Sequence, residues 1–251
     1  MYPTLEIGPL VIPTAGLVYI VGLWLALSAV ERAAARLGLH VPATYTLAVT
    51  GVAAGFVGAR LVFVALHWTA YSDNLLGIVW PLTSGFHLET GLLIGVAAAF
   101  FYGRLRELPP ASTLDAVAPG LLVALIAVSL ADFLAGPGYG EQADLPWSIS
   151  LFGIRRHPVQ IYEIAAGAAA LLSWQWALRQ GRLPGRPFLV SAAVYSAGRL
   201  LADAYRANAP LTGGGYHVLQ IISLAVLLIS LFFLALLSGG EDDVLAQEAV
   251  E

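Results

Sequence analysis

Long stretches without a charged residue are the feature that most constrains this chain. Residues 7–30 and 207–240 carry no charge, and residues 108–129 carry only Asp115. A helix needs about 20 mostly apolar residues to cross the hydrocarbon core of a bilayer, so these stretches predict transmembrane helices. The chain is 59% hydrophobic and only 11% charged, whereas a soluble domain is about 25% charged. We therefore predict an all-α, polytopic integral membrane protein.

The hydrophobic pattern predicts about seven transmembrane helices. A shorter apolar stretch at 75–82 precedes the third of them and predicts a partial or interfacial helix, so the count ranges from about six to eight. The predicted spans are residues 10–30, 44–66, 90–103, 114–134, 159–178, 187–204 and 217–238.

The arginines predict the orientation of these spans. The chain has 12 basic residues, all arginine. Its first charged residue is Glu6, which argues against a signal peptide, because a signal peptide begins with a basic segment. Cytoplasmic loops are enriched in basic residues, which places the N-terminus outside and the C-terminus in the cytoplasm. The loops predicted to be cytoplasmic hold Arg32, Arg36, Arg104, Arg106, Arg179, Arg182 and Arg186, and the opposite loops hold only Arg155, Arg156 and Arg206.

The formal charge of −4 is concentrated at the C-terminal end. Residues 1–238 are predicted to form a single transmembrane helical domain, followed by an acidic cytoplasmic tail at 239–251. Without the five tail carboxylates the charge is +1, so the chain lacks the basic field that nucleic-acid binding requires. The absence of cysteine excludes a disulfide scaffold and a thiolate metal site. The sequence predicts neither a metal nor a cofactor.

Charged residues inside the predicted sixth span point to a functional site. An ionised side chain at the centre of a membrane helix costs roughly 2.5–3.5 kcal/mol on insertion scales. Arg199, Asp203 and Arg206 have spacings that place them on one face of a helix. This face either forms a structural ion pair or binds an anionic ligand, because guanidinium groups grip phosphate and carboxylate bidentately. In the second case Asp203 orients one arginine and leaves the other for the ligand.

Arg60 in the second span has two similar interpretations. It is either an arginine that snorkels to the outer interface or a second anion-binding arginine. Gly51, Gly55 and Gly58 precede it at a spacing that allows helices to approach each other closely.

Polar residues also precede two of the predicted spans. In residues 157–163, Pro158 is suited to a helix start, and His157, Gln160 and Glu163 follow one another at intervals of three. These residues indicate either a proline-started helix with a favourable acidic residue or a polar cluster that opens onto a cavity. His87, before the third span, is either a surface residue or a neutral-pH base.

Several separated segments resemble the bacterial prolipoprotein diacylglyceryl transferases, a family of seven-span inner-membrane enzymes. Residues 156–163 resemble the family's Arg-His-Pro-x-Gln-x-Tyr-Glu, which is the most specific match, and residues 58–64 resemble its Gly-Gly-Arg-x-x-Tyr-Val. Four other segments also resemble family motifs, and all lie in the same order along the chain as in the family: residues 15–19, 91–95, 195–199 with Arg206, and 219–223. The resemblance covers roughly residues 8–238.

This resemblance implies transfer of a diacylglyceryl group from phosphatidylglycerol to the lipobox cysteine of prolipoprotein signal peptides, with release of glycerol phosphate. The implied partners are these substrates and membrane lipid, and the implied location is the bacterial inner membrane. Arg199 would bind phosphate and His87 would act as a base. Arg60, Arg206, His157, Gln160, Tyr162, Glu163 and Asp203 would bind substrate or shape its cavity.

The chain departs from the family pattern at several of the expected active-site positions. Ser129, Asp132, Ala135 and Pro137 stand where the fourth-span signature carries an arginine, two asparagines and a glutamate, and Thr90 stands where a histidine is expected. These departures leave a second interpretation open, that of a catalytically inactive relative that binds lipid or lipoprotein without transfer. A small transporter is a third, although the sequence shows no inverted repeat.

Overall fold

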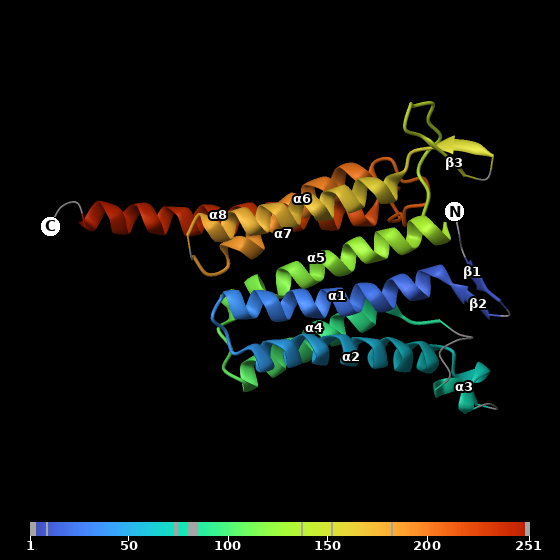
Figure 1. The fold of residues 1–251 in the computed structure, drawn as a ribbon, viewed down its shortest axis with the longest axis horizontal. Coiled ribbons are helices and arrows are strands. Elements are labelled where there is room, and N and C mark those ends of the chain that lie inside the picture. Colours follow the sequence, from blue (N-terminus) through green and yellow to red (C-terminus); the bar gives the residue numbers. More distant parts are fainter. Residues whose placement is uncertain are drawn as a thin grey trace. The chain divides into compact units, whose positions relative to one another are not determined.

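The structure, a computed structural model, describes residues 4–8, 10–72, 75–79, 85–136, 138–151, 153–181 and 183–248 and is mostly helical (Figure 1). The long helices are α1 (Thr14–Arg36), α2 (Val41–Leu66), α4 (Leu88–Leu105), α5 (Pro110–Ala135), α6 (Val159–Arg179), α7 (Arg186–Asp203) and α8 (Val218–Glu248). Shorter elements are a 3₁₀ helix at Trp68–Ala70 and α3 (Leu76–Val79). Two antiparallel hairpins are formed by β1 (Thr4–Ile7) with β2 (Leu10–Pro13) and by β3 (Ile149–Leu151) with β4 (Ile154–Arg156).

Each predicted span overlaps one long helix, which confirms the helical fold class. Among the described residues, five helices are long and apolar enough to cross a membrane: α1, α2, α4, α5 and α8. The predicted start of the first span at residue 10 is wrong, because residues 10–13 pair with β1 and the helix begins at Thr14. The partial helix predicted at 75–82 appears as α3, and residues 80–82 lie outside the described part of the chain.

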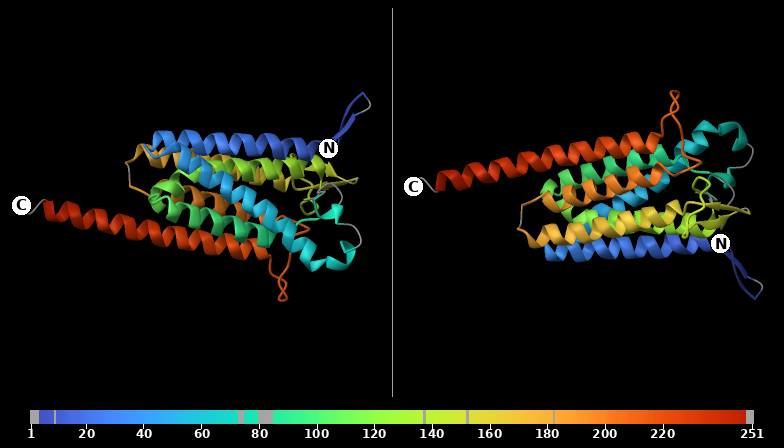
Figure 2. Two further views of the ribbon diagram at one scale, coloured as in Figure 1. Left: turned by 90° about the horizontal axis from the view of Figure 1, so that it is seen from below. Right: turned by 90° about the horizontal axis from the view of Figure 1, so that it is seen from above.

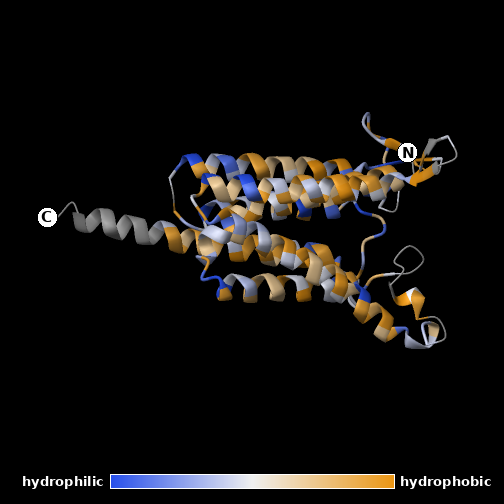
Figure 3. Cartoon of the chain, turned by 60° about the horizontal axis from the view of Figure 1, so that its bottom comes forward, coloured by the Kyte–Doolittle hydropathy of each residue, from blue (hydrophilic) through white to orange (hydrophobic). Residues whose placement is uncertain are grey.

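The apolar character of the helices continues onto their exposed faces (Figure 3). Hydrophobic residues dominate the helices, and hydrophilic residues gather towards their ends. On α8, the large side chains of Ile221, Leu224, Leu228 and Phe232 are all exposed, as a lipid-facing helix requires. This helix continues without a break to Glu248, well into the predicted acidic tail (Figure 2).

Residues 30–117 form one compact unit, here called the Arg60 unit. Its α2 and α4 lie side by side because glycines of the two helices face each other (Figure 1). A Cβ atom on Gly95 would lie 2.6 Å from the carbonyl oxygen of Gly51, and one on Gly91 would lie 2.7 Å from that of Gly55. The close approach predicted from the glycine spacing of the second span is therefore confirmed.

Residues 1–29 and 118–251 form the second compact unit, here called the Glu163 unit. Within it α7 packs against both α6 and α8. Small residues again set the helix separation, since a Cβ atom on Gly198 of α7 would lie 2.5 Å from the Cβ atom of Ala166 on α6. This packing brings the polar residues of α5, α6, α7 and the start of α8 into one cluster.

Candidate functional site

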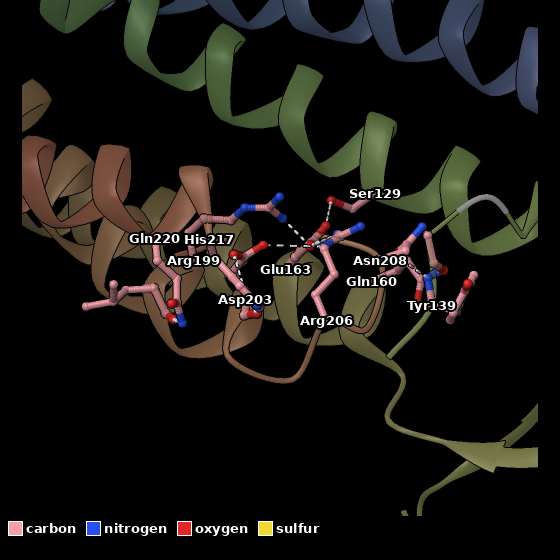
Figure 4. A network of polar contacts seen from close by, with 12 residues as sticks. Ser129, Tyr139, Gln160, Glu163, Arg199, Asp203, Arg206, Asn208, His217 and Gln220 are labelled. Carbon is pink, nitrogen blue, oxygen red and sulfur yellow. Dashed lines mark hydrogen bonds and ion pairs between the residues drawn. The ribbon is translucent and has the colours of Figure 1, made fainter. Parts of the chain in front are cut away.

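A buried carboxylate, Glu163 on α6, is the centre of the candidate site (Figure 4). Its side chain is only 3% exposed and forms ion pairs through the same oxygen, Oε1, with the guanidinium groups of Arg199 and Arg206. The hydroxyl group of Ser129 on α5 donates a hydrogen bond of 2.8 Å to the other oxygen, Oε2. One carboxylate therefore joins α5, α6, α7 and the turn after α7.

Arg206 reaches this cluster from outside α7. The helix ends at Asp203, so the prediction that Arg206 continues the helical face is wrong. Arg206 instead forms a β-bridge with Gly140, and its backbone N–H donates to the carbonyl of Asp203. A Cβ atom on Gly138 would lie 2.8 Å from Nη1 of Arg206, so a glycine there leaves room for the guanidinium group.

Asp203 extends the cluster on the side away from Glu163. It is fully buried, and its Oδ1 lies 3.5 Å from Nε of Arg206. Its Oδ2 lies 3.1 Å from Nδ1 of His217, the residue that precedes α8. Figure 4 shows Asp203 with His217 on one side and Arg206 on the other.

The cluster combines opposite charges that compensate one another where little of their surface is exposed. Two guanidinium groups meet two carboxylates, so their formal charges cancel. A buried ion pair adds little net stability, but removal of one partner leaves an uncompensated charge and typically costs about 3–5 kcal/mol. Among the described residues, Glu163 is the one ion-pair partner of Arg199, whose side chain is 15% exposed. A guanidinium group has five N–H donors, so Arg199 retains donors for a further anion.

The segment at residues 157–163 lies beside this cluster. Helix α6 begins at Val159, directly after Pro158, as the proline predicted. Gln160 is 1% exposed, and its amide group donates to the carbonyl of Gly138. The ring of His157 stacks on Tyr205 with 4.5 Å between centroids, and its Nδ1 lies 3.2 Å from the Tyr162 hydroxyl.

In the other unit, Arg60 is a buried residue whose guanidinium group binds backbone carbonyls. It is 7% exposed and donates to the carbonyl oxygens of Ile78, Gly85 and Gly77 at 3.0, 3.0 and 2.5 Å. The rings of Tyr71 and Phe86 lie 5.3 and 5.7 Å from its central carbon. Arg60 thus fastens α3 and the residues before α4 to α2, and this burial does not fit a snorkelling side chain.

His87 belongs to the same unit and lies just before α4. Its backbone N–H donates to the carbonyl of Ala59, and its Nδ1 lies 2.8 Å from the hydroxyl group of Thr90. The predicted site residues are therefore divided between the units, with Arg60 and His87 in one and the other seven in the other.

Two members of the cluster were not predicted from the sequence. In the sequence Ser129 stands out only as a departure from the family pattern, yet it donates to the central carboxylate. No motif in the sequence marks His217. Its position at the first residue of the last predicted span, close in sequence to the charged end of the sixth, is the one signal that points to it.

These features define a multi-pass helical membrane protein with a buried, charge-compensated polar cluster. A family model described as "Prolipoprotein diacylglyceryl transferase" matches residues 3–236, and the chain belongs to this family of transferases. The family resemblance predicted from the sequence is confirmed.

Similar curated proteins bear the name phosphatidylglycerol–prolipoprotein diacylglyceryl transferase. The protein of Synechococcus elongatus is 29% identical over 242 residues, which cover 90% of this chain and 83% of that protein. The protein of Staphylococcus aureus strain JH9 is 26% identical over 241 residues, with 90% and 85% covered. The protein of Clostridioides difficile is 24% identical over 193 residues, with 77% of each chain covered.

Proposed function

We propose that this protein transfers a diacylglyceryl group from phosphatidylglycerol to the lipobox cysteine of prolipoproteins at the outer face of the bacterial inner membrane. The names of the relatives support this reaction. The proposal includes seven spans, with the N-terminus outside and the acidic tail in the cytoplasm. The distribution of arginines between loops supports this orientation.

The observation that carries the proposal is the pair of guanidinium groups that contact the buried carboxylate of Glu163. Arg199 and Arg206 would hold the phosphate of phosphatidylglycerol and stabilise the charge on departing glycerol phosphate. Glu163 and Asp203 would fix the two arginines in position. An incoming phosphate would bind the N–H donors of Arg199 that do not contact Glu163.

The remaining predicted residues would shape and complete the site. His157, Gln160 and Tyr162 would line the cavity beside the arginines. Arg60 would act through the carbonyl of Gly85, which it binds two residues before His87. The reaction also needs a proton acceptor, because the thiolate is the nucleophile and a free thiol has a pKa of about 8.5.

The alternative is a relative that binds lipid or lipoprotein without transferring it. The serine at position 129 and the threonine at position 90, where the family pattern has arginine and histidine, favour this alternative. In the structure the hydroxyl group of Ser129 donates to Glu163, but it lacks the positive charge of the arginine in the family pattern.

Expression in bacterial cells depleted of their own transferase tests the two functions against each other. A reporter lipoprotein should gain the mass of a diacylglyceryl group, and the Arg199→Ala variant should not support this gain. Arg106→Ala is the matched control, because Arg106 is an exposed arginine at the end of α4 and should leave the modification unchanged. An unmodified reporter, with the protein present in the membrane, would contradict transfer.

A further inference from the structure

His217 is held in a defined place by the loop before α8. Residues 211 and 217 form an antiparallel bridge, and the backbone N–H of Val218 donates to the carbonyl of Pro210 at 2.9 Å. The N–H of Thr212 donates to the carbonyl of Tyr216 at 2.8 Å within the same turn. The histidine side chain is 24% exposed, so it borders the cluster without being sealed inside it.

The contacts of His217 determine which ring nitrogen carries its proton. Nδ1 lies 3.0 Å from the backbone carbonyl oxygen of Asp203 and 3.1 Å from its carboxylate Oδ2. Both neighbours are acceptors, so Nδ1 must be the N–H donor. In the neutral ring the lone pair is then on Nε2, for which the described residues provide no hydrogen-bond partner. A histidine oriented in this way by a buried carboxylate has the arrangement of a general base.

Neither of the other histidines near predicted site residues has this arrangement. Nδ1 of His87 meets the hydroxyl group of Thr90, which can donate or accept and therefore does not fix the tautomer. Nδ1 of His157 meets the hydroxyl group of Tyr162, which already accepts a hydrogen bond from the indole of Trp147. The described residues place no carboxylate in an ion pair with either ring.

Asp203 also links His217 to the arginine cluster. Its Oδ2 faces the histidine while its Oδ1 faces Nε of Arg206, which pairs with Glu163. When Nε2 takes up a proton, Nδ1 of the His217 ring still faces the buried Asp203 carboxylate at 3.1 Å. The site proposed to bind phosphate and the histidine are thus neighbours through one side chain.

We propose that Nε2 of His217 accepts the proton of the lipobox thiol. This inference rests on the proposed transfer reaction, and it places the base of that reaction at His217 and not at His87. The S–H proton moves to Nε2, and the thiolate attacks the glyceryl carbon that bears the phosphate oxygen. A C–S bond forms and the C–O bond breaks, with its electron pair leaving on glycerol phosphate. The imidazolium then releases its proton to water.

A comparison of two peptide substrates tests this role in the full-length protein. Purified protein in mixed micelles with phosphatidylglycerol is given a synthetic lipobox peptide or the same peptide with selenocysteine in place of cysteine, kept reduced. A selenol is ionised at neutral pH and needs no base. His217→Gln should slow transfer to the cysteine peptide by roughly 10²–10⁴-fold, the usual contribution of a general base, and should retain transfer to the selenocysteine peptide. His67→Gln, the same substitution at an exposed histidine directly after α2, should transfer to both peptides as the unmodified protein does.

The opposite results overturn the assignment. A base at His217 is contradicted if His217→Gln transfers to the cysteine peptide at the wild-type rate. It is also contradicted if the transfer rate falls equally with both peptides, because a purely structural defect affects both substrates alike. Asp203→Asn is a second variant, since an amide can reverse the tautomer, and it should show the same preference for selenocysteine. If the unmodified protein transfers to neither peptide, the proposed function itself is wrong.

Discussion

Replacement of Glu163 by glutamine would remove the buried negative charge that the guanidinium groups of Arg199 and Arg206 share. Glutamine keeps the size of the side chain and an oxygen that can accept from Ser129 and from one arginine. It cannot compensate Arg199 and Arg206 together, so the cluster changes from formal neutrality to an excess of one positive charge. Since all three side chains are at most 15% exposed, water does little to screen that charge.

The expected cost is that of breaking a buried ion pair by removal of one partner, about 3–5 kcal/mol. For a chain of this size, 1 kcal/mol corresponds to a shift in melting temperature of roughly 2–4 °C, so a loss on the order of 10 °C is expected. Glu163→Gln combined with Arg206→Gln restores neutrality. The double variant should therefore recover about 1–3 kcal/mol relative to the sum of the two single losses.

Thermal unfolding in detergent micelles, followed by the fluorescence of the six tryptophans, measures these changes. Glu31→Gln is the matched control, because it makes the same substitution at an exposed position of α1 and should leave the melting temperature unchanged. Two results would contradict charge compensation by Glu163. One is a melting temperature of Glu163→Gln equal to that of the wild-type protein. The other is a double variant whose loss equals the sum of the two single losses.

Three further predictions concern the rest of the molecule. Arg60→Lys should lower the melting temperature and the transfer rate, because one ammonium group cannot reach three separate carbonyls and each lost bond to a charged donor is worth about 1.5–3 kcal/mol; unchanged values for both would count against its proposed role. Gly95→Ala should destabilise the α2–α4 contact by about 1–3 kcal/mol, whereas Gly16→Ala, with no atom within 4 Å of the added Cβ, should be neutral; equal effects would argue against glycine-dependent packing. Because the chain has no cysteine, single cysteines can be introduced at residues 143 and 247, and a membrane-impermeant maleimide should label only the first in intact spheroplasts; the reverse pattern would invert the proposed orientation.

The helices were predictable because each is a long apolar stretch bounded by charges, proline or glycine. Helix α2 begins with a proline in its first turn, and α7 begins after Gly185, whose φ is 90°. The β1–β2 hairpin was missed because residues 7–30 read as one uncharged apolar stretch, in which hydrophobicity alone does not separate a four-residue strand from a helix.

The candidate site was only partly predictable because its contacts join residues far apart in the chain. Helical spacing placed Arg199 and Asp203 on one helix, α7, but it could not indicate that this helix stops at Asp203, that Arg199 pairs with Glu163, and that a bridge to Gly140 positions Arg206. Likewise, Ser129 precedes Glu163 by 34 residues, and only the packing of α5 against α6 brings the two together. Arg60 resembles a ligand arginine by sequence because no local pattern reveals the backbone carbonyls that surround it.

The most direct measurement of the proposed function is a reconstituted transfer reaction with both products followed by mass spectrometry. Purified full-length protein, phosphatidylglycerol and a lipobox peptide should give a peptide with a thioether-linked diacylglyceryl group and an equal amount of glycerol phosphate. Neither product should form with Arg199→Ala. If folded wild-type protein gives neither product while a relative transfers under the same conditions, this protein is not an active diacylglyceryl transferase.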